Sequence, residues 1–347
     1  MTNPPLDERS REVLKSVIQL HIATGEPVGS ENLARALGRT LSSATLRTIM
    51  AELEKRGYLE QPHTSAGRQP TDEGYRVYVD SLMSHTLLSP RDAAAIDSGL
   101  RTLEGSPSQV METASHLLSH HSGKVGFVLV PEMGRGSLRR VDLVRLPHPR
   151  ILVVVVSVTG LVTNRIIEVE EEMSQEELQA CANYLNAHFS GLGLATIRAR
   201  LLELMRQEKA LYDSLLKSVV AVGGRAFSAE SEADLYLEGT SKLLDAPELS
   251  DLARMRALFK TFEEKGRLVK ILNACLGRDG IRITIGHENA DPDLRQVAVV
   301  TASVPLDVDE AWGIGVVGST RMEYARMIAL VDHVARALNQ TLKELRS

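Results

Sequence analysis

The clearest pattern of apolar and polar positions lies between residues 42 and 59. Apolar side chains recur there at spacings of three and four residues, which predicts a helix that buries one stripe against a core. Ser42 precedes the stripe and is a suitable N-cap, because its hydroxyl can accept a hydrogen bond from a first-turn amide. The stripe consists of Leu46, Ile49, Met50 and Leu53. The opposite face is free to contact another molecule and carries Ala44, Thr48, Ala51 and Lys55, flanked by Thr45 and Arg47.

The segments on either side of this helix predict a DNA-binding unit. A first helix before Gly25 and a short second helix at 31–37, capped by Ser30, precede a tight turn at 38–41, which is helix-turn-helix spacing. After the main helix, residues 58–61 alternate as a short strand and 62–67 form a turn-rich tip. Capped amphipathic helices also occur in domains that bind no DNA. The hairpin that follows is what favours a winged helix-turn-helix.

Charge and composition agree with sequence-specific binding. The net charge of −5 argues against a protein that coats nucleic acid, and 4% aromatic residues argue against a single-strand stacking platform. Residues 35–70 nevertheless hold six basic and three acidic side chains, a local excess of 6 − 3 = +3. We predict base contacts from Thr45, Arg47 and Thr48. We predict phosphate or hairpin contacts from Ser43, Lys55, His63, Thr64, Ser65 and Arg68, although an arginine at such a place is also often a solvated loop residue.

The rest of the chain alternates between strand and helix patterns. β-branched runs at 125–130, 138–146, 151–158 and 161–169 predict strands, and a capping box of Ser174 and Glu177 predicts a helix at 174–188. Further strands are predicted at 281–286, 296–304 and 313–317, before a long helix at 321–345. A helical stretch at 196–276 separates the two blocks of strands. This order predicts an α+β multidomain protein in which one domain interrupts another.

Several blocks resemble the HrcA family of heat-inducible transcription repressors, over nearly the whole chain. The most specific is Gln61–Arg68 (QPHTSAGR), and the others are Gly25–Ser30, Ser42–Thr45, Met50–Glu54, Pro70–Thr71, Gly74–Asp80, Ile285–Asn289 and Gly313–Tyr324. Three positions depart from the family pattern as we know it. Thr48 replaces a usual Asn, Ser319 a usual Pro, and Gln69 a common aliphatic residue. Since Thr offers fewer hydrogen bonds to adenine than Asn, Thr48 is expected to cost about 1–3 kcal/mol at one base pair per half-site.

The resemblance implies a domain plan and a set of partners. It implies a winged helix domain at 1–84, a helical linker at 85–122, a GAF-like α/β domain at 123–195 and 277–347, and an inserted, mainly helical dimerising domain at 196–276. Apolar stripes in the insert, such as Leu201, Leu204, Leu211 and Leu215, suit either a core or a partner. We therefore expect a homodimer that represses chaperone genes from an inverted-repeat operator, kept active by the GroE chaperonin and inactivated by heat. The uncharged run Ile151–Val156 is of the kind that aggregates when a fold opens.

Enzymatic chemistry is not predicted. No nucleophile elbow, phosphate loop, dinucleotide fingerprint or metal-ligand motif is visible, so we predict no catalytic, cofactor or metal site. The turn at Gly313–Arg321 can be a capped strand-to-helix connection, which we favour, or an anion site, and a metal at His116, His120 and His121 is disfavoured. The alternative function is a metabolite-responsive regulator that senses its ligand through the GAF-like domain. Two distant cysteines, no leader pattern and no long apolar run predict a cytoplasmic protein that binds no membrane.

Overall fold

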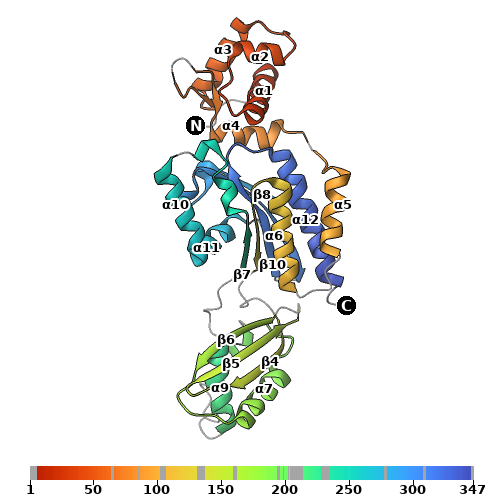
Figure 1. The fold of residues 1–347 in the computed structure, drawn as a ribbon, viewed down its shortest axis with the longest axis vertical. Helices are drawn as coiled ribbons and strands as arrows, with labels where there is room; N and C mark the ends of the chain where they lie inside the picture. The colour runs from red at the N-terminus through yellow and green to blue at the C-terminus, as the bar shows by residue number, and fades with distance from the viewer. Residues whose placement is uncertain are drawn as a thin grey trace.

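The computed structural model is elongated, with three parts arranged along its long axis (Figure 1). It describes residues 6–63, 66–84, 86–101, 107–130, 137–158, 162–193, 196–197, 199–201, 203, 214–227, 234–249, 251–276, 280–307 and 310–344. We call the parts the N-terminal unit (6–84), the body (86–130 with 234–344) and the distal unit (137–227). The molecule is a mixed α/β protein, as the sequence predicted at this coarse level.

The N-terminal unit is helical and ends in a small hairpin. Its elements are α1 (Glu8–Thr24), α2 (Ser30–Ala36), α3 (Ser43–Lys55), β1 (Leu59–Glu60), β2 (Gln69–Pro70), α4 (Asp72–Val77) and a π-helical turn η1 (Tyr78–Leu82). Val13, Leu14, Val17 and Ile18 of α1 are fully buried, so α1 lies beneath α3 as predicted. The unit therefore presents α3 and the hairpin away from the body (Figure 1).

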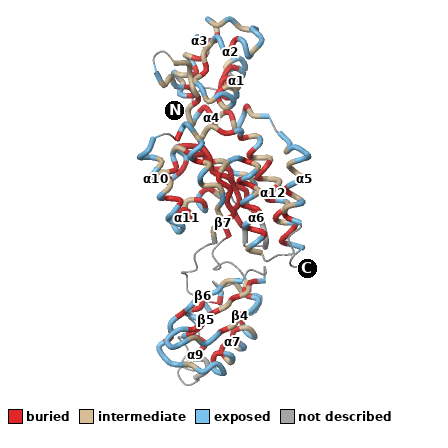
Figure 2. Tube along the Cα trace, in the orientation of Figure 1, coloured by how far each residue is buried: buried red, intermediate tan, exposed pale blue. Residues whose placement is uncertain are grey.

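A five-stranded antiparallel sheet of order β7-β3-β10-β9-β8 forms the centre of the body. Its strands are β3 (Val125–Val130), β7 (Asp234–Glu238), β8 (Ile281–Ile285), β9 (Val297–Asp307) and β10 (Glu310–Ser319). One face is covered by α6 (Pro107–Ser122) and α12 (Tyr324–Glu344), with α5 (Pro90–Arg101) packed against these two helices, and the other by α10 (Leu252–Glu263) and α11 (Lys265–Cys275) (Figure 1). Because both faces are covered, the centre of the body is largely buried (Figure 2), and β3 is buried at every position.

Helix α6 approaches the sheet closely at a glycine. A Cβ at Gly126 in β3 would collide with the backbone of Ser115 and Ser119 in α6. Ile96 and Leu100 of α5 and Leu118 of α6 are fully buried in the same core as α12. The structure therefore differs from the expected linker at 85–122: the segment is helical as expected, but both helices are integral to the body.

The distal unit has its own core. Strands β4 (Leu138–Arg145), β5 (Arg150–Ser157) and β6 (Val162–Glu168) pair only with one another, and α7 (Gln175–Phe189) and α9 (Ser214–Ala226) cover one face. The capping box of Ser174 and Glu177 begins α7 as predicted.

The sheet pairing differs from the expectation that residues 123–195 and 277–347 form one domain. Only β3 of the first block joins the body, whereas α10 and α11, expected in the insert, cover the body sheet. Periodicity shows that a segment is a strand but does not show which strand it pairs with. Leu204 and Leu211, two of the stripe residues, lie outside the described residues. No helix in the described ranges is long and apolar enough to cross a membrane.

Candidate nucleic-acid interface

Helix α3 forms as its sequence predicts. The Ser42 hydroxyl accepts a hydrogen bond from the Thr45 amide at 3.1 Å and caps the first turn. Leu46, Met50 and Leu53 are buried, which turns the opposite side of the helix outward. Helix α2 differs in one detail, because Gly29 is its N-cap and Ser30 is already its first residue.

The predicted contact residues of α3 divide into exposed and engaged side chains. Arg47, Thr48 and Lys55 are exposed, and His63 is exposed at the hairpin. Ser43 and Thr45 are half-buried, and both hydroxyls lie in the capping region. Ser43 Oγ is 3.0 Å from Ser30 Oγ, and Thr45 Oγ1 is 2.8 Å from Ser42 Oγ. These two hydroxyls are therefore already hydrogen-bonded within the protein.

Thr48 is exposed, but its hydroxyl proton is already used. The hydroxyl donates to the Ala44 carbonyl one turn earlier at 3.2 Å. The oxygen can still accept a hydrogen bond, and the methyl group can make an apolar contact. A thymine methyl is the base feature that an exposed methyl fits.

The hairpin is fixed to the rest of the unit at several points. Leu59 pairs with Pro70 and Glu60 with Gln69, and the Gln61 side chain closes the tip by donating to the Ala66 carbonyl at 2.9 Å. Thr64 and Ser65, two of the predicted contacts, lie outside the described residues.

Arg68 has a role that the sequence did not reveal. Its backbone pairs with Val28 in both directions, and its guanidinium forms an ion pair with Glu54 of α3 at 2.8 Å. The side chain is only 17% exposed. In this structure Arg68 therefore ties the hairpin to α3, rather than lying free in a loop.

Arg39 is a further candidate contact, which the sequence indicated only as one of the basic residues in the segment 35–70. It lies in the turn between α2 and α3, is exposed, and has a φ of +59°, the one such value for a non-glycine residue in the described chain. A left-handed conformation costs an L residue roughly 1–2 kcal/mol. Gly or Asn would adopt this conformation at a lower cost in free energy, so the feature that distinguishes Arg39 is its cationic side chain. A cation beside the outward face of α3 suits a phosphate.

The site contains no arrangement for metal chemistry. Among the described residues, no three His, Cys, Asp or Glu side chains gather as a metal site. The rings of His116 and His120 stack with centroids 6.1 Å apart on one face of α6, and His121 pairs with Asp92.

At the turn after β10, Arg321 pairs with Glu248 and donates to the Ile22 carbonyl, which supports the structural interpretation of that turn.

Comparisons with known proteins agree on one family. A model described as the HrcA protein C terminal domain matches residues 108–328. A heat-inducible transcription repressor HrcA of Geobacter sulfurreducens is 39% identical over 97% of this chain and 98% of its own length. That of Syntrophobacter fumaroxidans is 36% identical over 98% of both chains. The crystal structure of a hypothetical protein, 22% identical, covers 99% of this chain and 100% of its own, with a TM-score of 0.64, and so has a similar fold.

Proposed function

This chain belongs to the HrcA family of heat-inducible transcription repressors, and on that premise we propose that it binds an inverted-repeat operator at chaperone genes as a homodimer. We assign the N-terminal unit as the winged helix domain, with α3 in the major groove and the β1–β2 hairpin as the wing. The observation that carries this proposal is the outward face of α3, on which Arg47, Thr48 and Lys55 are all exposed beside that hairpin.

The direct test replaces one side chain on that face. Arg47→Ala should weaken binding to an inverted-repeat duplex by about 1–3 kcal/mol, while binding to a scrambled duplex changes much less, because only the base contact is lost. Fluorescence anisotropy across a salt series measures both. Arg254→Ala, which removes an exposed arginine of α10, is the matched control. Equal losses on the two duplexes would contradict a base-reading role for Arg47.

We assign dimerisation to the outer face of the distal sheet. Alternate side chains of its strands point away from α7 and α9, and cross-strand rows of that face are aliphatic: Val144, Leu152 and Ile166 form one row, and Val156 and Val162 begin another. Val162 and Ile166 are 57% and 56% exposed. The row between them, Asp142, Val154 and Asn164, is partly polar, and Arg140, opposite Val156, pairs with Asp142. An exposed sheet face with aliphatic rows of this kind suits a second, identical face related by a two-fold axis. The inserted dimerising domain is then 137–227, in place of 196–276.

The oligomeric state tests this assignment. Ile166→Glu should convert the dimer into a monomer in sedimentation velocity, because each copy would bury an unpaired carboxylate in the apolar contact. Leu252→Glu introduces the same charge at a 74% exposed leucine of α10 and should leave the dimer intact. A dimer that survives Ile166→Glu at the same concentration would contradict the assignment.

We further infer that the five-stranded body is the GAF-like domain and that the GroE chaperonin keeps the repressor active in the cytoplasm. The run Ile151–Val156 supports chaperonin dependence, since it forms β5, whose alternate side chains contribute to the aliphatic outer face. After a mild heat-and-cool cycle, operator binding should recover with chaperonin and ATP and remain low without them. Full recovery in both samples would refute chaperonin maintenance.

A metabolite-responsive regulator is the second candidate function. A cleft of about 500 Å³ between α1, residues 86–89 and the start of α12 supports it, because a ligand there would touch both the N-terminal unit and the body. Its walls combine apolar and polar side chains, including Tyr78, Leu88, Asp92 and Tyr324. A metabolite that raises the melting temperature and changes operator affinity would favour this function. A broad thermal-shift screen without any such compound would count against it.

A further inference from the structure

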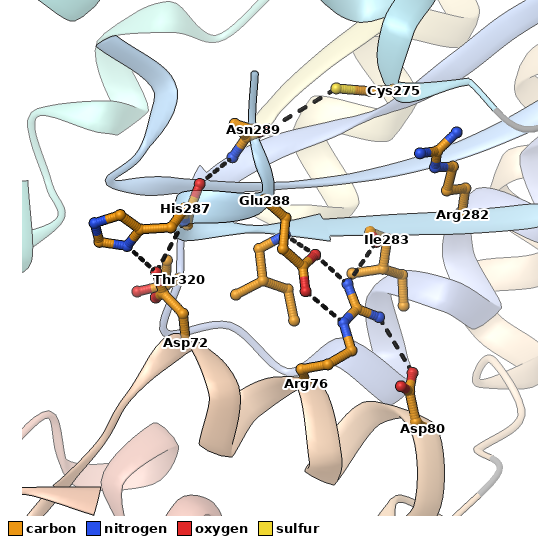
Figure 3. Close-up of polar contacts among 12 residues, drawn as sticks. Asp72, Arg76, Asp80, Cys275, Arg282, Ile283, His287, Glu288, Asn289 and Thr320 are labelled. Atoms are coloured by element: carbon orange, nitrogen blue, oxygen red, sulfur yellow. Dashed lines mark hydrogen bonds and ion pairs between the residues drawn. The ribbon is translucent and has the colours of Figure 1, made fainter. Parts of the chain in front are cut away.

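The N-terminal unit is joined to the body by polar contacts between segments far apart in the chain (Figure 3). The first contact is made by Arg76 in α4. Its Nε donates to Glu288 Oε1 at 2.6 Å, a second nitrogen pairs with the other carboxylate oxygen, and the same guanidinium donates to the Ile283 carbonyl at 2.7 Å. Arg76 also pairs with Asp80 in its own unit. One guanidinium therefore contacts β8 and the turn that follows it.

The environment of Glu288 favours its charged form. Burial alone would raise the pKa of this carboxyl, but the hydrogen bond from Arg76 and another from the Ile285 amide hold the pKa below its usual range. Glu288 is thus an anion at neutral pH, held in place by its own turn before Arg76 reaches it. A preorganised carboxylate opposite an arginine gives a directional contact.

The second contact lies one turn earlier on α4. Asp72 Oδ2 accepts hydrogen bonds from the His287 amide at 2.9 Å and lies 2.6 Å from His287 Nδ1. The neighbouring Gly286 has a φ of +52°, and a Cβ there would collide with the Asp72 carboxylate. Any side chain at 286 would therefore displace the Asp72 carboxylate and disrupt its contact with His287.

The third contact reaches α1 in place of α4. Arg321, just before α12, donates to the Ile22 carbonyl of α1 at 2.9 Å and pairs with Glu248 of the body. Between the polar contacts, the buried rings of Tyr75 and Tyr324 lie 5.8 Å apart. The N-terminal unit is thus held by two polar contacts on α4, one on α1 and an apolar contact. Together these contacts constrain both the tilt and the rotation of the unit relative to the body.

We propose that Asp72, Arg76 and Arg321, with Gly286, His287 and Glu288, form a clamp that positions α3 relative to the body. This proposal rests on the proposed function, since it explains how two α3 helices of a homodimer are held at the half-site separation of an inverted repeat. The members are positioning residues, because none lies on the exposed face of α3. The half-site spacing that the dimer prefers then depends on the contacts between the N-terminal unit and the body as well as on the dimer contact.

The first experiment measures the orientation of the unit without DNA. Spin labels at Lys55→Cys in α3 and Leu252→Cys in α10 report the distance between the N-terminal unit and the body by pulsed electron resonance. The native Cys181 and Cys275 are buried, so they compete little for the label. A narrow distance distribution should broaden in Arg76→Ala and in Gly286→Ala. It should stay narrow in Arg267→Ala, which removes ion pairs with Asp291 and Asp293 inside the body. An unchanged distribution in both joint variants overturns the clamp.

The second experiment measures the consequence for DNA. Binding is compared on a single half-site, on the native inverted repeat and on repeats lengthened by one or two base pairs. In Arg76→Ala, the ratio of the affinity for the native repeat to the affinity for a lengthened repeat should fall about tenfold. The affinity for the half-site should stay unchanged. The double variant Arg76→Ala/Glu288→Ala should lose little more than either single variant. Unchanged spacing preference, or an equal loss on the half-site, overturns the positioning role. If the wild-type protein binds full and half-sites alike, the proposed operator is wrong, while the label distances still decide whether the clamp exists.

Discussion

At the scale of single residues, a substitution of Arg39 should affect the stability of the fold and the affinity for DNA in different ways. Replacing it with glycine relieves the left-handed backbone, so the free energy of unfolding should stay unchanged or rise by up to about 1 kcal/mol. Operator affinity should nevertheless fall, and the slope of log affinity against log salt should shrink by about 0.9, the value for one phosphate contact. Denaturant unfolding and anisotropy measure the two effects. An unchanged salt slope would show that Arg39 meets no phosphate.

His21 gives the N-terminal unit a dependence on pH. Burial lowers the pKa of this imidazole below its usual 6.5, although the Glu26 carbonyl, 3.0 Å from Nδ1, opposes the effect. The folded state therefore favours neutral His21. Its contribution to stability is complete above pH 6.5 and is lost as the pH falls from there toward the folded pKa. The melting temperature should fall less between pH 7.5 and 5.5 in His21→Gln than in the wild type; equal falls would assign the dependence to other groups.

Single residues were predictable from sequence where the chemistry is local. Ser42 and Ser174 cap the helices that follow them, because a cap depends only on residues three positions away. The Arg68–Glu54 pair was not predicted, since its partners are brought together only when the hairpin folds onto α3. For the same reason, the sequence counted Arg39 as a charge but did not reveal its positive φ.

At the scale of elements, the cap of α3 has a measurable effect. Ser42→Ala leaves the Thr45 amide without its acceptor, which should cost about 1 kcal/mol of stability. The loss should be concentrated in α3, so hydrogen exchange in its first turn should accelerate more than exchange in α6. Ser42→Asp, which keeps an acceptor, should restore protection. Uniform acceleration across the molecule would instead indicate a global loss of stability.

Most strand and helix positions followed from periodicity, while their grouping did not. The run at 125–130 is uncharged and the run at 138–146 contains three arginines and one aspartate, but neither pattern names a partner strand: β3 joins the body sheet and β4 joins the distal sheet. The helices at 252–263 and 265–275 have apolar faces that would fit either core. Pairing depends on contacts between distant segments, about which a single sequence carries little information.

At the scale of the whole molecule, the distal unit should be removable. It leaves the body after β3 and returns at β7, and Val130 pairs directly with Asp234. Replacing residues 131–233 with a turn of about four residues should therefore preserve the body and the N-terminal unit as a folded monomer. This variant should bind a half-site with the affinity of the full chain. It should lose the additional affinity that the full chain has for the inverted repeat. Sedimentation and anisotropy test both points; a dimeric deletion variant would place the dimer contact elsewhere.

The position of β3 in the middle of the body sheet also bears on how each copy is made. This strand is buried at every residue, but its neighbours β7 and β10 begin only at residues 234 and 310. A ribosome releases the chain from the N-terminus, so Val125–Val130 leaves the exit tunnel long before either neighbour exists. Every nascent copy thus passes through an interval in which this apolar strand has neither of its neighbouring strands. We expect a newborn repressor to need folding assistance even without heat, so that its rate of maturation would report how much chaperone capacity the cell has free.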